Sequence, residues 1–174
     1  MIISAVRNEK EFEDALYSKS GIIFDLSPSV LDLEEKVRKA HEYNKKIFIH
    51  LDLAEGIGKD KAGICFVKKL GIDGVISTRV SVIKLAREEK LFTVQRFFIV
   101  DSQSLNTAVE SVKSSRPDMV EIMPGVVEKV ISCIKEKISV PIIAGGLIEN
   151  AKEIKAALDA GATAVSTGKK EFWG

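Results

Sequence analysis

Short apolar runs alternate with longer amphipathic stretches along nearly the whole chain. The runs are rich in β-branched and aliphatic residues, which is typical of strands in a parallel sheet covered by helices. They predict strands at Ile2–Val6, Gly21–Leu26, Lys46–Leu53, Gly74–Thr78, Thr93–Val100, Met119–Met123, Val140–Ala144 and Ala164–Thr167. The stretches between them repeat apolar residues at i, i+3 and i+4 and so predict helices. These are Glu9–Ser18, Val30–Tyr43, Asp60–Leu70, Val80–Lys90, Ser104–Ser114, Val126–Lys137 and Asn150–Ala160.

Residues that begin and end helices agree with this division. Side chains that cap a helix N-terminus stand before four of the stretches, at Asn8, Ser29, Ser102 and Asn150. Gly71 and Gly161 follow two others, where a helix commonly ends in the left-handed conformation. Strand and helix alternate throughout, so the connections are expected to be right-handed βαβ units.

Eight strands and seven full helices favour a compact (β/α)8 barrel of the TIM type over an open sheet. We expect residues 1–174 to form one such domain, without a linker or a second domain. Only Lys169–Gly174 follow the last strand, so the final helix is expected to be truncated or missing. A second copy of the chain could cover the flank left open, which would make the protein a homo-oligomer.

Composition narrows the function classes. The chain has 26 basic and 25 acidic residues and a net charge of +1, so any contact with nucleic acid needs a local basic patch. No apolar run is long enough to cross a bilayer, and the first residues do not resemble a signal peptide. Two cysteines, Cys65 and Cys133, lie far apart and are expected as buried free thiols, as in the reducing cytoplasm.

The turns after the last two predicted strands suit a phosphate group. In a TIM-type barrel, phosphate commonly lies at the loops after strands seven and eight. Gly145 and Gly146 follow the seventh strand, and Ser166, Thr167 and Gly168 end the eighth. Glycine lets backbone N–H groups approach an anion, and the two hydroxyls add donors. The glycines could instead serve only to make tight turns, but two such turns at consecutive strand ends favour phosphate.

Other polar side chains interrupt the apolar strands near their carboxyl ends. They are Asp25, His50, Asp52, Ser77, Arg96 and Glu121. His50 and Asp52 are two residues apart, which would put them on the same side of a strand. A charge inside a closed barrel is costly unless it is paired or used. Some of these residues could form structural pairs, for instance Arg96 with Glu121, but so many together favour a polar pocket.

An enzymatic interpretation is weaker. The His50-x-Asp52 pair resembles metal ligands of ribulose-phosphate epimerases, but such a site needs a second histidine, and His41 is expected on a helix surface. No lysine ends a strand as a Schiff-base aldolase requires. We therefore expect no catalytic residue, metal or cofactor. A polar pocket of this kind suggests a sensor, with a sugar-phosphate isomerase, epimerase or aldolase as the alternative.

Several segments together carry a family resemblance. They are Ile47–Gly56, Asp73–Thr78, Gln95–Ser102, Pro117–Gly125, and Pro141–Ile148 followed by Ala160–Ala162 and Val165–Thr167. In this order they resemble the glycerol uptake operon antiterminator regulatory protein family, and the likeness runs from about Ala5 to Trp173. The chain departs from the family at Ser4, where proline is usual, and at Gly168, which replaces a serine and removes one hydroxyl donor.

The resemblance implies a cytoplasmic regulator that binds glycerol 3-phosphate. In that state it would act on the leader messenger RNA of a glycerol-utilisation operon and prevent premature termination of transcription. The phosphate turns and the polar pocket agree with such a ligand. The RNA function depends on the resemblance alone, and we expect RNA phosphate contacts from basic residues near the barrel mouth, namely Arg79, Lys169 and Lys170.

Overall fold

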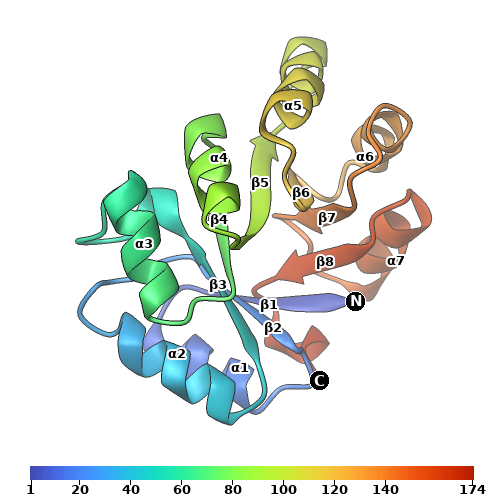
Figure 1. Ribbon diagram of the computed structural model, residues 1–174. Helices are drawn as coiled ribbons and strands as arrows, with labels where there is room; N and C mark the ends of the chain where they lie inside the picture. The colour runs from blue at the N-terminus through green and yellow to red at the C-terminus, as the bar shows by residue number, and fades with distance from the viewer.

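Eight parallel strands close into a barrel in the computed structural model, which describes residues 1–174 (Figure 1). The strands are β1 (Ile2–Val6), β2 (Ile22–Asp25), β3 (Lys46–His50), β4 (Gly74–Ser77), β5 (Phe92–Phe98), β6 (Met119–Met123), β7 (Ile142–Gly145) and β8 (Ala164–Thr167). Each strand pairs with the next along the chain, and β1 also pairs with β8, which closes the ring. The predicted fold class is confirmed.

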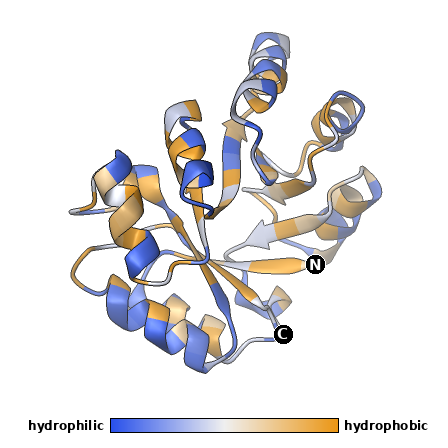
Figure 2. Ribbon diagram, in the orientation of Figure 1, coloured by the Kyte–Doolittle hydropathy of each residue, from blue (hydrophilic) through white to orange (hydrophobic).

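Seven helices surround the strands. They are α1 (Glu9–Leu16), α2 (Leu33–Glu42), α3 (Lys61–Lys69), α4 (Val80–Glu88), α5 (Ser102–Ser115), α6 (Glu128–Lys135) and α7 (Ala151–Asp159). Each helix contains both hydrophobic and hydrophilic residues, as expected of helices with one buried and one exposed face (Figure 2). No helix combines the length and the apolar character needed to cross a membrane.

The predicted final helix is reduced to one turn of 3-10 helix, η2 (Lys170–Phe172), as expected. Trp173 follows it and is only 3% exposed. The indole Nε1 donates a hydrogen bond to the Thr167 carbonyl at 2.8 Å, and the Trp173 carbonyl accepts from the backbone N–H groups of Lys19 and Ser20. This short tail therefore packs where the eighth helix would otherwise lie.

Three predictions about where an element begins or ends were wrong, and the first two concern β3 and α5. The third strand ends at His50, and one turn of 3-10 helix, η1 (Leu51–Leu53), follows it. Asp101 caps α5 in place of Ser102, because its carboxylate accepts from the backbone N–H of Ser104 in a capping box.

The third concerns Ser29, which does not cap α2. This helix begins at Leu33 and has Asp32 at its N-cap position. The Ser29 carbonyl accepts a hydrogen bond from the Leu33 backbone N–H at 3.0 Å, and Ser29 also forms an isolated parallel bridge with Glu55. This bridge holds Ser29 in extended backbone before the helix, so the helix starts later than predicted.

The remaining signals for helix starts and ends agree with the structure. Asn8 and Asn150 cap α1 and α7 through their side chains, and Gly71 and Gly161 take positive φ angles just after α3 and α7. The other strand and helix boundaries fall within a few residues of the predicted ones. Cys65 and Cys133 are free, as expected, but they are half-buried where full burial was predicted.

Candidate functional site

A buried polar network crosses the carboxyl end of the barrel interior. Arg96 on β5 donates from Nε to the Glu121 carboxylate on β6 at 2.6 Å, and the Ser166 hydroxyl on β8 donates to the other oxygen of that carboxylate at 2.5 Å. Glu121 is fully buried, and Arg96 and Ser166 are 6% and 4% exposed. Arg96 and Glu121 are direct partners in the register of β5 and β6. The structure therefore contains the Arg96–Glu121 pair that the sequence suggested.

A small pocket of about 70 Å³ opens above this network. Six residues proposed from the sequence line it, namely Arg96, Glu121, Gly146, Ser166, Thr167 and Gly168. They come from the carboxyl ends of β5 to β8 or the turns that follow. The two predicted phosphate turns and part of the predicted polar pocket thus lie at one opening of the barrel.

Arg7 also lines this pocket, although it was not among the predicted site residues. It follows directly after β1, so its position at a strand end was a usable signal. Its Nη1 atom lies 3.2 Å from the point where a Cβ on Gly168 would stand. The pocket therefore has two guanidinium groups, an exposed one on Arg7 and a buried one on Arg96. Glu121 lines the same pocket and compensates the charge of Arg96, so the charge that attracts an anionic group comes from Arg7.

The glycines of the seventh turn have separate roles. A side chain on Gly145 would overlap the Glu121 carboxylate and lie 2.6 Å from the Ser166 hydroxyl. Gly145 therefore leaves room for the buried network, and it does not line the pocket. Gly146 does line it, with a φ of +78° that favours glycine.

The Thr167 hydroxyl is already used within the chain. It donates to the Ile148 carbonyl at 3.1 Å and accepts from the Lys169 backbone N–H at 3.1 Å. These bonds join the turns after β7 and β8, so the side chain of Thr167 holds the pocket wall in place. Of the two hydroxyls, that of Ser166 lies nearer the buried charges.

Four of the proposed pocket residues, Asp25, His50, Asp52 and Ser77, do not line this opening. Asp25 pairs with Lys36 of α2 at 3.2 Å, between the strands and the helices. Asp52 lies on η1 and accepts hydrogen bonds from the Ser77 hydroxyl at 2.7 Å and from Thr78. Asp25, His50, Asp52 and Ser77 are therefore not pocket-lining residues. The side chains of Asp25, Asp52 and Ser77 connect strand ends to neighbouring elements.

The predicted alignment of His50 with Asp52 was wrong. The chain turns into η1 at Leu51, so the two residues do not share one side of a strand. Burial raises the pKa of the Asp52 carboxyl, but hydrogen bonds from Ser77 and Thr78 outweigh this effect and keep that pKa below its usual value. No three His, Cys, Asp or Glu side chains are grouped so that they could hold a metal ion.

His50 itself is buried, at 4% exposure. Its Nδ1 atom has no hydrogen-bond partner in the chain. Burial and then the positive charge of Arg96 hold the pKa of the imidazole below its ordinary value. His50 is therefore neutral near neutral pH, and it adds no further positive charge to the buried network.

The basic residues proposed to contact RNA are all partly exposed, and each has a carboxylate nearby. Arg79 lies 3.8 Å from Asp52, Lys169 lies 3.7 Å from Glu149, and Lys170 pairs with Asp14 of α1. His41, expected on the surface, is exposed and shares a hydrogen bond with Asp73 at 2.9 Å.

Comparison with known proteins identifies the family. The family described as glycerol-3-phosphate responsive antiterminator matches residues 2–173. The chain belongs to this family. An uncharacterized protein of Escherichia coli K12, YgcP, is 37% identical over 99% of this chain and 91% of its own length.

Solved structures of similar proteins agree with this family assignment. The glycerol uptake operon antiterminator regulatory protein of Listeria monocytogenes is 34% identical, with a TM-score of 0.94 over 99% of this chain and 94% of that one. An antiterminator-related protein of Thermotoga maritima is 28% identical, with a TM-score of 0.89 over 99% and 96%. Orotidine 5′-phosphate decarboxylase of Pyrococcus horikoshii, at 21% identity and a TM-score of 0.76 over 96% and 88%, shares the barrel fold.

Proposed function

We propose that this protein binds glycerol 3-phosphate in the pocket at the carboxyl end of the barrel and, in that state, acts on a leader RNA as a transcription antiterminator. The family and its Listeria relative support a regulator of glycerol uptake. The observation that carries the ligand assignment is that the exposed Arg7 and the buried Arg96–Glu121 pair line one opening beside the turns of Gly146 and Gly168. The proposal implies a single cytoplasmic domain.

The phosphate would lie beside Arg7 and the backbone of the two turns. Glycine there allows close approach to the main chain, and the exposed guanidinium adds charge-assisted hydrogen bonds. The present opening of about 70 Å³ is smaller than a typical ligand pocket of roughly 300 Å³ or more. Binding therefore requires exposed side chains at the rim, such as Arg7 and Leu147, to move outward.

The glycerol hydroxyls would reach the buried network. Arg96 uses only Nε in its bond to Glu121, so its remaining N–H groups are free to donate to a ligand. The Glu121 carboxylate can accept a further bond from a hydroxyl, and such a bond is stronger than one between neutral groups. A phosphate at the rim and a polyol beneath it would thus use both parts of the pocket.

Isothermal titration calorimetry tests this ligand assignment. Glycerol 3-phosphate should bind, whereas glycerol and inorganic phosphate should each bind much more weakly because they use only part of the site. Arg7→Gln should weaken binding by roughly tenfold to a hundredfold, since it removes hydrogen bonds to a charged group. Arg38→Gln on α2, an exposed arginine paired with Glu42, should leave affinity unchanged. Equal affinity for all three ligands would contradict the proposal.

The RNA half needs a separate test. Gel-shift titrations with a leader RNA of a glycerol-utilisation operon should show binding in the presence of glycerol 3-phosphate. Binding should fall by roughly one logarithmic unit per log unit of salt for each phosphate contacted. Arg79→Gln, Lys169→Gln and Lys170→Gln should each reduce this slope. Absence of any shift, with or without the ligand, would refute the RNA half and leave the ligand half intact.

The enzymatic alternative has lost its main support. It depended on His50 and Asp52 acting together from one strand face, and Asp52 instead lies on η1 and bonds to Ser77. Aldolases and a decarboxylase share the barrel fold at low identity, which concerns the fold alone. We therefore propose a sensor without a second function at this pocket.

A further inference from the structure

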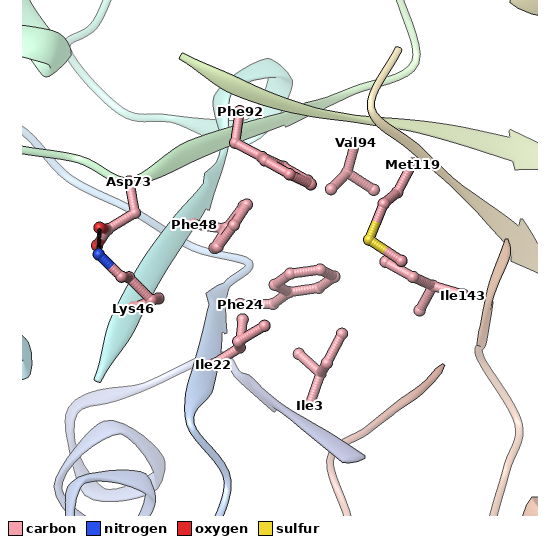
Figure 3. A pocket seen from close by; sticks show the side chains of 10 residues that line it. All are labelled: Ile3, Ile22, Phe24, Lys46, Phe48, Asp73, Phe92, Val94, Met119 and Ile143. Carbon is pink, nitrogen blue, oxygen red and sulfur yellow. Dashed lines mark hydrogen bonds and ion pairs between the residues drawn. The ribbon is translucent and has the colours of Figure 1, made fainter. Parts of the chain in front are cut away.

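The barrel interior is hollow at its amino end, opposite the pocket described above. The cavity measures about 330 Å³ and is lined by residues from the beginning of the strands, such as Phe92 at the start of β5 and Met119 at the start of β6. Figure 3 shows the lining side chains converging from several strands on one central space. Phe92 is 40% exposed, so the cavity reaches the surface beside its ring.

Gly74, at the start of β4, helps to explain the shape of this cavity. A side chain at Gly74 would overlap the ring of Phe48, so the ring lies against the bare backbone of β4. The rings of Phe24 and Phe48 have centroids 5.6 Å apart, as do those of Phe48 and Phe92. Most barrels fill this layer with bulky branched side chains. Here three aromatic rings form one wall and leave the centre empty.

The lining favours an apolar guest over water. Eight of its ten residues are hydrophobic. The two others, Lys46 and Asp73, lie to one side and pair with each other at 2.9 Å (Figure 3). Water in such a space needs two or more polar partners, which the apolar walls do not provide, whereas apolar walls of this kind accept guests such as benzene.

The size and the lining together indicate the class of guest. An engineered cavity of about 150 Å³ takes one benzene ring, so a space about twice as large has room for two fused rings. Aromatic rings favour edge-to-face and offset contacts with another ring, and the Met119 thioether adds a sulfur–aromatic contact. We propose that the amino end of the barrel is a second ligand site, which binds a small neutral aromatic molecule of one or two rings. This site is independent of the proposed function.

Indole is a suitable probe because it is neutral and has two fused rings. In methyl-resolved NMR spectra of the full chain, indole should shift the methyl signals of Ile3, Ile143 and Met119, which line the cavity. The methyl signals of Ile131 and Ile134, which pack in the helix layer around α6, should stay in place. No shift at saturating indole, or shifts confined to the helix layer, would overturn the proposal.

A variant that fills the cavity tests the site directly. Val94→Phe places a ring in the empty space and should lower indole affinity by about tenfold or more. Leu147→Ala, at the opposite end of the barrel, should leave indole affinity unchanged. Unchanged affinity in Val94→Phe would overturn the proposal.

A measurement without indole covers the case in which Val94→Phe is poorly folded. Because the added ring enters empty space, Val94→Phe should keep or raise the thermal midpoint. Val75→Phe is the matched control, since Val75 is fully buried in the packed layer outside the strands, where a larger side chain has no room. It should lower the midpoint. If both variants lower it equally, the amino end is packed in solution and the proposal fails.

Discussion

The two ends of the barrel interior are built from the same strands but have opposite chemistry. At the carboxyl end, Arg96, Glu121 and Ser166 join in a buried network beneath a small polar pocket. At the amino end, Phe24 and Phe48 lie beside a larger apolar cavity. The main charged pair of the first end lies inside the barrel, whereas the Lys46–Asp73 pair of the second lies at its edge.

This difference shows how one closed ring of strands can separate two kinds of chemistry. Alternate residues of each strand face the interior, so a polar layer and an apolar layer can follow each other along the barrel axis. A buried charge is tolerated only where partners surround it. The carboxyl layer provides those partners, because the Glu121 carboxylate accepts hydrogen bonds from Arg96 and Ser166. The layer at the amino end is mostly apolar and therefore needs no such partners.

Glu121→Ala should give the largest change in stability. It removes the buried partner of Arg96 and leaves an unpaired charge inside the barrel, which costs roughly 3–5 kcal/mol. Urea denaturation followed by circular dichroism measures the loss. The double variant Arg96→Met with Glu121→Leu should lose much less stability, because no unpaired charge remains inside the barrel. Lys46→Ala at the amino end should also lose little, because Lys46 is mostly exposed. Equal losses of stability for Glu121→Ala and Lys46→Ala would contradict the difference between the buried charged pair of the carboxyl end and the exposed pair of the amino end.

A smaller effect should separate two glycines of the carboxyl end. Gly145→Ala forces apart the Glu121 carboxylate and the Ser166 hydroxyl, and we expect it to cost roughly 1–3 kcal/mol. Gly168→Ala meets the flexible end of Arg7 at 3.2 Å and the Ala5 carbonyl at an ordinary contact distance of 3.6 Å, so it should stay within about 0.5 kcal/mol of the parent. Urea midpoints measured side by side provide the test. A larger loss for Gly168→Ala would show that the network does not depend on Gly145.

The sequence was informative where a pattern extends over many residues. Strand and helix periodicity predicted the barrel and its truncated last helix, and the turns after β7 and β8 predicted one side of the pocket. It was less informative where a side-chain direction depends on a single turn. Asp52 was assigned to a strand, but η1 turns it towards Ser77. The alternation of residues in β2 does not reveal that Asp25 would meet Lys36 on a helix rather than a ligand.

Two further features depend on tertiary contacts that no local pattern contains. Arg7 joins the pocket because β1 lies beside β8, and these strands are at opposite ends of the sequence. The amino-end cavity arises from the way three phenylalanine rings pack around Gly74. Each of these residues has an ordinary place in a strand pattern, and only ring closure brings them together.

The pH dependence of stability should depend on the buried histidine at the carboxyl end of the barrel, His50. The pKa of His50 is lowered in the folded state by burial and by Arg96, so the unfolded chain binds its proton more readily. The unfolded state therefore gains protons first as pH falls through about 6.5, the ordinary histidine value, and stability decreases there.

His50→Gln should accordingly lose less stability between about pH 7 and about pH 5.5 than the parent chain does. Urea midpoints across this range measure the difference. If the dependence on pH persists unchanged in His50→Gln, the buried histidine of the carboxyl end is not the group that titrates.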